Sequence, residues 1–377
     1  MSKTILAVFH DNNLASGATK SFLSNIEYLK NSGDKIIALI PKKEGDLSEY
    51  LSNLGIEVHH ATYGGNVFAN SDNILTILKN YFRCLIKSII SYISSYQLSE
   101  IVKNRSIDCV YSNTSTIYMG AWIAQKLKVN HFWHFREFCL EDQNSRRIWE
   151  RGFVKLGRNA SKIFTISNTI DEYYVSKYGF KNTVMVYNDI SDSYINTKKI
   201  NHEGINILIT GTICKEKGQE YAIKAIRELN NSLIHLYIAG RINKYAKALM
   251  KDLNRDSVVN ITFCGLVKDM RELRSNMDIS LVCARREAFG RTIIEDMLSG
   301  IVVVGCDTGA VTELVKDDFT GYVYEYGDVE ELKEVIIRAV QDNDKLEKIR
   351  ENAFEFATKF TKNTTAQRIR GIIDEID

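Results

Sequence analysis

The sequence predicts an α/β protein built of two doubly wound domains that face a cleft. Short apolar runs alternate with helical patterns along the whole chain, which is typical of parallel sheets covered by helices on both faces. This pattern occurs twice, and a polar stretch without periodicity, Asn196–Gly204, separates the two series and is expected to be the linker. A chain of 377 residues is long enough for two domains of ordinary size, each with its own core.

The first series of elements predicts a doubly wound sheet in the N-terminal half. After its first strand comes a loop with Gly17, followed by a helix that extends to about Lys30. The strands predicted in this half are Thr4–Phe9, Lys35–Ile40, Ile56–His59, Asp108–Tyr111, His131–His134, Lys162–Ile166 and Thr183–Tyr187.

The second series repeats the same architecture. Its predicted strands are Ile205–Thr210, His235–Ala239, Ile261–Cys264, Ile279–Val282 and Ile301–Val304, with a helix over Gln219–Asn230. Asp328 followed by Glu331 three residues later is typical of a helix N-cap, and helices are expected to fill most of the chain beyond it.

Composition excludes several classes of protein. The 49 basic and 47 acidic residues give a net charge of +2, which is not the signature of a nucleic-acid-binding protein. The seven cysteines are scattered and odd in number, as expected of reduced thiols in a cytoplasmic protein. The N-terminus has the pattern of a strand rather than of a signal peptide, and no apolar run reaches the length of a membrane span.

Residues 75–101 predict a long amphipathic helix with two open interpretations. Its apolar stripe is Tyr81, Leu85, Ile89, Tyr92, Ile93 and Tyr96, and its basic row is Lys79, Arg83 and Lys87. In the first interpretation the stripe faces the core and the basic row is a solvated face. In the second, the helix makes a peripheral contact with an anionic membrane surface.

The segment Arg286–Glu295 predicts an anion site at a helix N-terminus. A strand ends near Val282, and Gly290 stands where the next helix begins, so backbone N–H groups and the helix dipole favour a phosphate there. Glu287 and Glu295 flank this position. Because a carboxylate can accept hydrogen bonds from two hydroxyls, they suit a sugar on one side and a ribose on the other. The alternative is a loop-surface glutamate followed by a solvated helix glutamate.

A second loop supports the phosphate site. In Thr210–Gly218 a strand ends at Gly211, and Lys217 with Gly218 precedes the next helix. A lysine at this place points toward the strand-end crevice of a doubly wound sheet and neutralises a diphosphate. Taken alone, such a lysine also fits a solvent-facing loop.

At these residues the sequence resembles glycosyltransferase family 4. The run from Glu287 to Gly321 resembles the donor-binding signature of that family, with matches at Glu287, Phe289-Gly290, Glu295, Gly300, Gly309, Glu313 and Asp317–Gly321. Gly211 through Lys217-Gly218 is similar to its phosphate-binding loop, and Ser16-Gly17-Ala18 to its N-terminal glycine loop. His134, in W-H-F-R-E, falls where the family often has an active-site histidine. Ser167 and Asn188 resemble elements on the hinge side.

This resemblance implies a GT-B fold, with two Rossmann-like domains, and a retaining, metal-independent glycosyltransferase. The expected reaction transfers a sugar from a nucleotide-diphosphate sugar, a UDP-sugar first of all, to a glycan, lipid-linked or protein acceptor in bacterial polysaccharide or glycoconjugate biosynthesis. Residues 1–195 would bind the acceptor, and a helix at about 360–377 would pack back on them. Residues 204–359 would bind the nucleotide sugar.

The resemblance also assigns roles to individual residues. It implies catalytic roles for Glu287, Lys217 and His134. It implies donor contacts for Gly17, Gly211, Thr212, Lys217, Ala288, Phe289, Gly290, Arg291, Thr292 and Glu295. No cofactor or metal is expected, because the sequence has no Cys/His cluster and the D-x-D at Asp342–Asp344 is typical of a turn or N-cap.

Several positions depart from the family pattern. Thr212 stands where an arginine usually assists the lysine, Ser16 replaces a loop glycine, and Asp189 replaces the glycine of an N-G element. Ile301-Val302 replaces the usual x-Pro. These departures keep two alternatives open: an epimerase or hydrolase of the same fold that acts on nucleotide sugars, and a non-catalytic partner subunit of a glycosyltransferase.

Overall fold

The structure, a computed structural model, describes residues 2–42, 44–196, 200–253, 260–341 and 343–376. The chain forms two compact units, Met1–Asp189 with Asn363–Asp377, and Ile190–Lys362. The segment after Asp189 belongs to the second unit, because the Ile190 N–H donates to the Phe360 carbonyl (2.8 Å) and the Asn196 N–H to that of Leu298 (3.3 Å). Residues 197–199 of the predicted linker lie outside the described residues.

In the part of the chain that the structure describes, the first unit contains a seven-stranded parallel sheet in the order β3-β2-β1-β5-β6-β8-β9. The strands are β1 (Thr4–Val8), β2 (Lys35–Pro41), β3 (Glu57–Ala61), β5 (Cys109–Asn113), β6 (Asn130–Phe135), β8 (Lys162–Thr165) and β9 (Thr183–Met185). β4 (Val67–Ala69) and β7 (Ser145–Arg147) form a small antiparallel pair. The helices are α1 (Gly17–Asn31), α2 (Leu47–Asn53), α3 (Ile74–Val102), α4 (Met119–Leu127), α5 (Leu140–Gln143), α6 (Glu150–Arg158), α7 (Asn168–Tyr178) and α15 (Thr364–Glu375).

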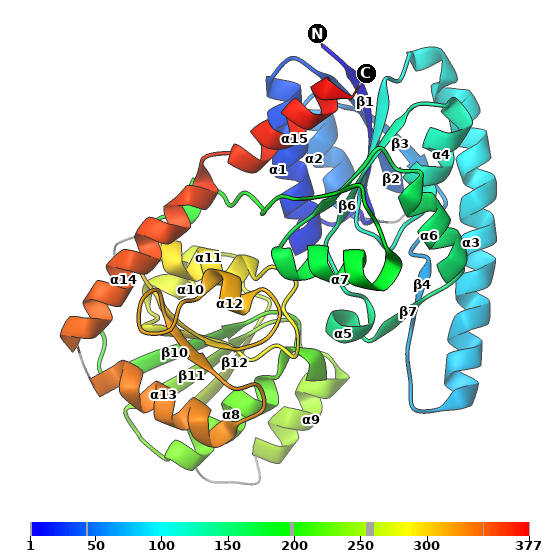
Figure 1. Ribbon diagram of the computed structural model, residues 1–377. Helices are drawn as coiled ribbons and strands as arrows, with labels where there is room; N and C mark the ends of the chain where they lie inside the picture. Colours follow the sequence, from blue (N-terminus) through cyan, green and yellow to red (C-terminus); the bar gives the residue numbers. More distant parts are fainter. Residues whose placement is uncertain (1, 43, 197–199, 254–259, 342, 377) are drawn as a thin grey trace. The chain divides into compact units, whose positions relative to one another are not determined.

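Both faces of this sheet are buried, which explains its near-continuous apolar strands. Ile5 and Ala7 of β1 pack with residues of α1, α2 and α15, whereas Leu6 and Val8 pack with residues of α3 and α4. Side chains of a strand alternate between faces, so one apolar run supplies two cores. Figure 1 shows α15 lying beside α1, and both ends of the chain in this unit.

The C-terminal helix α15 is tied to the first unit by a side chain that the family pattern does not contain. Asp189 accepts hydrogen bonds from the N–H groups of Thr365 (3.3 Å) and Ala366 (2.9 Å), the first turn of α15. At the other end, the Lys3 ammonium donates to the Ile373 carbonyl (2.9 Å). A carboxylate satisfies the unpartnered N–H groups of a helix start. The Asp189 departure therefore has a structural role as a helix cap.

The second unit, over its described residues, holds a six-stranded parallel sheet in the order β12-β11-β10-β13-β14-β15. Its strands are β10 (Ile205–Thr210), β11 (Ile234–Ala239), β12 (Ile261–Gly265), β13 (Ile279–Val282), β14 (Val302–Cys306) and β15 (Tyr322–Tyr324). Its helices are α8 (Gln219–Leu229), α9 (Lys244–Leu253), α10 (Met270–Ser275), α11 (Arg291–Leu298), α12 (Val311–Leu314), α13 (Val329–Gln341) and α14 (Asn343–Thr358), with short 3-10 turns η2 (Asp192–Tyr194), η3 (Lys215–Lys217) and η4 (Lys359–Thr361).

The predicted fold class of two doubly wound sheets is confirmed. The strands predicted over Ile205–Thr210 and Ile279–Val282 form with those bounds. The N-cap is also present, since Asp328 accepts from the Glu331 N–H (2.9 Å). The strands that the sequence analysis missed, β4, β7 and β15, have three residues each, too few for a periodicity to appear.

The structure of the long helix α3 overturns the interpretation in which its apolar stripe faces the core. Of the six stripe residues, Tyr81 and Leu85 are half-buried, and the other four are exposed: Ile89, Tyr92, Ile93 and Tyr96. The face toward the unit is lined mainly by small residues, Cys84, Ser88, Ser91, Ser95 and Ser99. These hydroxyls meet polar groups that an apolar stripe would leave unsatisfied: the Asn66 amide donates to Ser88 Oγ (2.8 Å), and the Gly64 N–H to Ser91 Oγ (3.3 Å). Figure 1 shows α3 beside α4. None of the helices in the described ranges has both the length and the apolar character to cross a membrane.

Candidate active site at the switch point of the second sheet

The candidate site lies where the strand order of the second sheet reverses. β10 and β13 are neighbours, but the strands that follow them, β11 and β14, lie on opposite sides of this pair. The loops that leave their carboxyl ends therefore separate, and ligands of doubly wound sheets bind in the resulting crevice. Gly211 to Lys217 follow β10, and Glu287 to Gly290 follow β13. The topology thus brings the two predicted loops to one place.

The two loops touch through their backbones. The Arg285 N–H donates to the Glu216 carbonyl (2.8 Å). Gly218 has φ +66°, and a Cβ there would lie 2.1 Å from the Cys283 carbonyl oxygen. Only glycine allows so close an approach of the two chains. The Gly218 that follows Lys217 is therefore required by packing as well as by the turn.

Lys217 and Glu287 form an ion pair across this contact. Lys217 Nζ lies 2.6 Å from Glu287 Oε2, and the two side chains are 31% and 16% exposed. The pair is accessible from solvent, while the backbone of the two loops is fixed by the contacts described above. Two of the residues with predicted catalytic roles thus meet directly, although 70 positions separate them in the chain.

The loop that carries Glu287 is fixed from behind by a second glycine. Gly309 has φ +58°, and a Cβ there would lie 2.2 Å from the Glu287 carbonyl oxygen. That oxygen accepts a hydrogen bond from the Ala310 N–H (2.8 Å). Gly290, with φ +90°, then starts α11, as the sequence predicted. The family-like spacing of Glu287, Gly290 and Gly309 therefore has a local steric cause.

The remaining residues of this loop differ in exposure. The side chains of Ala288 and Phe289 are buried, and the Phe289 ring packs near Phe360 (6.0 Å between centroids). Arg291 and Thr292 in the first turn of α11 are half-buried, and Thr212 after β10 is exposed. Gln219 bridges the β10 loop, donating to the Thr212 carbonyl (3.1 Å) and accepting from the Cys214 N–H (3.3 Å).

Glu295 belongs to a buried cluster of charges rather than to a solvated helix face. It is 7% exposed. Its Oε2 accepts from Arg274 Nη2 (2.9 Å) and its Oε1 from Arg291 Nη2 (3.2 Å). Arg274 Nε also donates to Asp296 Oδ1 (2.6 Å), and Ser280 Oγ to Asp296 Oδ2. The alternative in which Glu295 is a solvated helix residue is wrong.

Sequence reasoning missed Arg274 and Asp296. The side chains of both have no exposed surface. Burial by itself lowers the pKa of Arg274. The carboxylates of Asp296 and Glu295 have the larger combined effect and raise this pKa above its ordinary value. Arg274 is therefore a permanent cation that holds Glu295 in place. The sequence did contain a sign of this cluster: two adjacent acidic residues stand among the apolar residues of α11. Buried carboxylates require a partner, so a cation could have been expected nearby.

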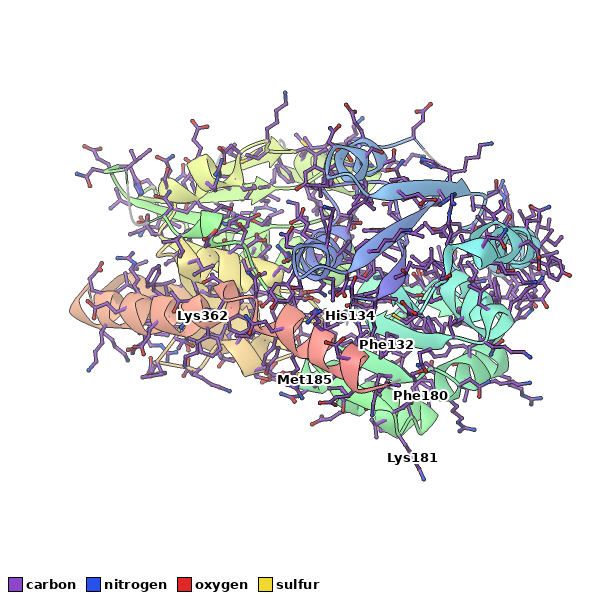
Figure 2. All side chains as sticks on the ribbon, turned by 90° about the horizontal axis from the view of Figure 1, so that it is seen from above. Phe132, His134, Phe180, Lys181, Met185 and Lys362 are labelled. Atoms are coloured by element: carbon purple, nitrogen blue, oxygen red, sulfur yellow. The ribbon has the colours of Figure 1, made fainter. Side chains whose placement is uncertain are left out.

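His134 and Gly17 lie in the first unit. Gly17 is exposed at the N-terminus of α1. His134, at the end of β6, is fully buried, and Figure 2 shows it on the same strand as Phe132. Its Nδ1 is bonded to the Tyr111 hydroxyl (2.8 Å) and to Arg136 Nη2 (3.1 Å). Because Nδ1 accepts, the proton is assigned to Nε2, which has no hydrogen-bond partner in the described part of the chain.

The surroundings of His134 keep it neutral. Burial lowers its pKa well below the usual value, and the Arg136 guanidinium adds to this. Arg136 is itself buried, and it donates to Asn113 Oδ1 (2.6 Å) and to Asn188 Oδ1. The sequence analysis did not single out Arg136 or Asn113. The sugar or acceptor contact of His134 stays a prediction.

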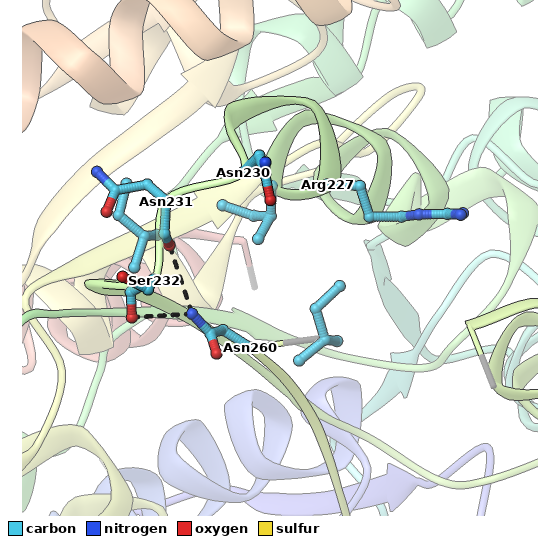
Figure 3. A pocket seen from close by; sticks show the side chains of 8 residues that line it. Arg227, Asn230, Asn231, Ser232 and Asn260 are labelled. Carbon is cyan, nitrogen blue, oxygen red and sulfur yellow. Dashed lines mark hydrogen bonds between the residues drawn. The ribbon is translucent and has the colours of Figure 1, made fainter. Parts of the chain in front are cut away.

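A separate cavity lies at the opposite edge of the second sheet. It has a volume of about 180 Å³ and is lined by the end of α8 and by Ile234 and Ile261, the first residues of β11 and β12. Figure 3 shows Asn260 there, whose amide donates to the carbonyls of Asn231 (3.4 Å) and Ser232 (2.9 Å). It lies at the amino ends of these strands, so it is not part of the candidate site.

Comparison with known proteins identifies the family. Residues 191–356 match the family of glycosyl transferases group 1, and residues 45–193 match Glycosyltransferase Family 4. The two matches support a glycosyltransferase of the family 4 type. An uncharacterized glycosyltransferase of Methanocaldococcus jannaschii is 24% identical over 300 residues, which cover 76% of this chain and 81% of the relative.

Two further relatives match over almost the whole length of this glycosyltransferase. The N,N'-diacetylbacillosaminyl-diphospho-undecaprenol alpha-1,3-N-acetylgalactosaminyltransferase of Campylobacter jejuni is 20% identical over 376 residues, 93% of this chain and 94% of the relative. The crystal structure of HepE from Anabaena, solved with UDP and glucose, superimposes with a TM-score of 0.78 and 19% identity over 99% of both chains. The predicted GT-B fold is thereby confirmed.

Proposed function

We propose that this glycosyltransferase moves a sugar from a nucleotide-diphosphate sugar, a UDP-sugar first of all, to a glycan, lipid-linked or protein acceptor, with retention of the anomeric configuration. The observation that carries this proposal is the Lys217–Glu287 pair at the switch point, beside the N-terminus of α11. The names of the relatives support it, one acting on a diphospho-undecaprenol sugar and one solved with UDP and glucose. The product belongs to polysaccharide or other glycoconjugate biosynthesis.

In the proposed mechanism, cations stabilise the departing diphosphate. Negative charge grows on it as the glycosidic bond breaks, and preorganised positive groups stabilise that charge more than they stabilise the ground state. Lys217 and the N-terminus of α11 at Gly290 supply these groups. Glu287 orients the sugar hydroxyls. Gly211 allows the donor to approach the β10 loop. The donor contact of Gly17, at the start of α1 in the first unit, stays a prediction.

Glu295 is proposed to bind the ribose hydroxyls of the donor. A carboxylate has about four acceptor positions, and Arg274 and Arg291 each use one, on different oxygens. The Tyr194 side chain also hydrogen-bonds to Glu295, so the acceptor position that remains is proposed to bind a ribose hydroxyl. The two arginines hold the carboxylate in one orientation before the donor arrives, which lowers the entropic cost of binding.

The proposed activity is tested by a donor screen followed by product analysis. Thermal shift identifies the donor, because a ligand that binds only the folded state raises the melting temperature. The identified donor is then incubated with and without candidate acceptors. Transfer that requires acceptor, with a product of retained anomeric configuration, supports the proposal. Release of the free sugar or of its epimer contradicts the proposal, and so does the absence of any product. We also propose a cytoplasmic location, which fits seven cysteines that are scattered and odd in number.

Glu295→Gln should weaken donor binding by about 1.5–3 kcal/mol, because hydrogen bonds to a charged carboxylate contribute that much. Glutamine keeps the shape of the buried side chain, so the fold is less disturbed than by alanine. Titration calorimetry with the identified donor measures the change. Glu330→Gln, at a 73% exposed position on α13, is the matched control. Equal affinities of the two variants would mean that Glu295 serves the fold only.

Activity should persist in EDTA, because the proposed charges that meet the diphosphate are Lys217 and a helix N-terminus. Within the described residues, the one acidic group with metal-like spacing is Glu325, Asp328 and Glu331, which contains none of the site residues. Asp342 of the D-x-D lies outside those residues. Turnover with chelator, alone and after addition of Mg²⁺ or Mn²⁺, provides the measurement. Loss of activity in EDTA that either ion restores would contradict the assignment of Lys217 and the helix N-terminus as the charges that meet the diphosphate.

A further inference from the structure

The outward side of α3 is an apolar surface along most of the helix. Ten large apolar side chains between positions 74 and 96 are 41–72% exposed: Ile74, Leu75, Leu78, Phe82, Ile86, Ile89, Ile90, Tyr92, Ile93 and Tyr96. Single exposed apolar residues are normal on soluble proteins, but a contiguous row of this length marks an interaction site. We call these ten residues the α3 face.

The helix cannot turn this face inward. Its opposite side is held by Ser88 and Ser91, which accept from Asn66 and Gly64, and by Cys84, whose thiol lies 3.8 Å from the Gly65 carbonyl. Rotation would break these bonds and place bulky isoleucines where only small residues fit. The α3 face is therefore a fixed feature of the fold.

Positive charge borders the α3 face. Lys79, Arg83 and Lys87 follow one another at intervals of four and form an exposed row beside it. The sequence has no acidic residue from position 74 to position 99. A second copy of the chain would bring the same cations against this row, so the charge favours an anionic partner.

An aromatic pocket continues the apolar surface. It has a volume of about 200 Å³ and is lined by residues that include Tyr92 of the α3 face, Trp122 and Trp149. The Tyr92 and Trp122 rings are 5.3 Å apart. Trp149 is 41% exposed and has φ +53°, which is uncommon for a bulky residue. Lys155 adds a cation at the pocket. Tryptophan, tyrosine and lysine together are typical of the boundary between lipid and water.

We propose that the α3 face, with the basic row and the aromatic pocket, docks on the surface of an anionic lipid bilayer. The helix lies in the plane of the membrane, with its apolar side chains at the acyl boundary and Lys79, Arg83 and Lys87 among the headgroups. The pocket receives lipid chain or headgroup carbon against Trp122 and Trp149. This surface would hold the enzyme at the membrane independently of its reaction.

The test is co-sedimentation of the full chain with vesicles of phosphatidylcholine alone and of phosphatidylcholine with phosphatidylglycerol. Wild type should bind only the anionic vesicles, and less at high salt. The triple variant Lys79→Glu, Arg83→Glu, Lys87→Glu should bind at least about 100-fold more weakly, because each cation near such a surface contributes about a fivefold effect and the three together about 100-fold. The variant Phe82→Ser, Ile86→Ser, Ile93→Ser should also lose binding.

A matched control makes the result specific. Lys244→Glu, Lys247→Glu, Lys251→Glu changes the same amount of charge on the exposed side of α9 and should bind anionic vesicles like wild type. Absence of vesicle binding by wild type, or equal binding by all variants, overturns the proposal. The proposal is also overturned if sedimentation velocity shows that wild type is a dimer and that the serine variant is a monomer. Donor binding, measured on the same samples, is expected to be unchanged, so a failure of the proposed function is recognised separately.

Discussion

Replacing Lys217 with alanine should lower turnover by roughly 100- to 1000-fold with little effect on folding. The loss of one group that stabilises developing charge typically costs ~2.7–4 kcal/mol of transition-state stabilisation. Lys217 stands in the short turn η3 and is 31% exposed, so the core does not depend on it. Thr212 stands where the family has an assisting arginine, and Arg291 already donates to Glu295. The loss is therefore expected near the upper end of the range.

Lys215→Ala is the control for this variant. Lys215 is an exposed lysine in the same turn, two residues earlier. Steady-state turnover of both variants is compared beside their melting temperatures. Because the interaction strengthens as the bond breaks, Lys217→Ala should affect kcat and not the donor affinity alone. A folded Lys217→Ala variant with turnover within about threefold of wild type would show that another cation meets the diphosphate.

Replacing Arg274 with methionine should lower the free energy of unfolding by about 3–5 kcal/mol, the usual cost of removing one partner of a buried ion pair. The change leaves Asp296 without its cation in a site with no exposure, and it frees one oxygen of Glu295. Donor affinity should fall as well, because Glu295 is then less well oriented. Urea unfolding and titration calorimetry measure the two effects.

Two further variants separate burial from charge. Arg271→Met removes an arginine of the same helix whose bond to Asp269 is exposed, and it should leave stability nearly unchanged. Arg274→Met combined with Asp296→Leu removes both buried charges, and it should recover much of the lost stability. If Arg274→Met loses no more stability than Arg271→Met, the buried cluster contributes little to the fold.

Much of the fold and part of the site follow from local sequence patterns. Apolar runs mark strands because both faces of a parallel sheet are buried, as with Ile5 and Leu6. Gly218, Gly290 and Gly309 are visible in the sequence because a close backbone approach or a positive φ admits no other residue there. For the same reason, the family resemblance and the phosphate loops could be recognised from spacing alone.

Contacts between distant segments could not be predicted in this way. The 2.6 Å pair of Lys217 with Glu287 depends on β10 and β13 being neighbours in the sheet. The ion pair of Arg274 with Glu295 joins α10 to α11, and no local periodicity indicates that contact. The orientation of α3 was decided by the polar groups of Gly64 and Asn66 in the loop between β3 and β4. Serines of α3 satisfy these groups, so the apolar side of the amphipathic helix faces outward. Amphipathicity tells that a helix has two faces, and only the tertiary structure decides which of them is buried.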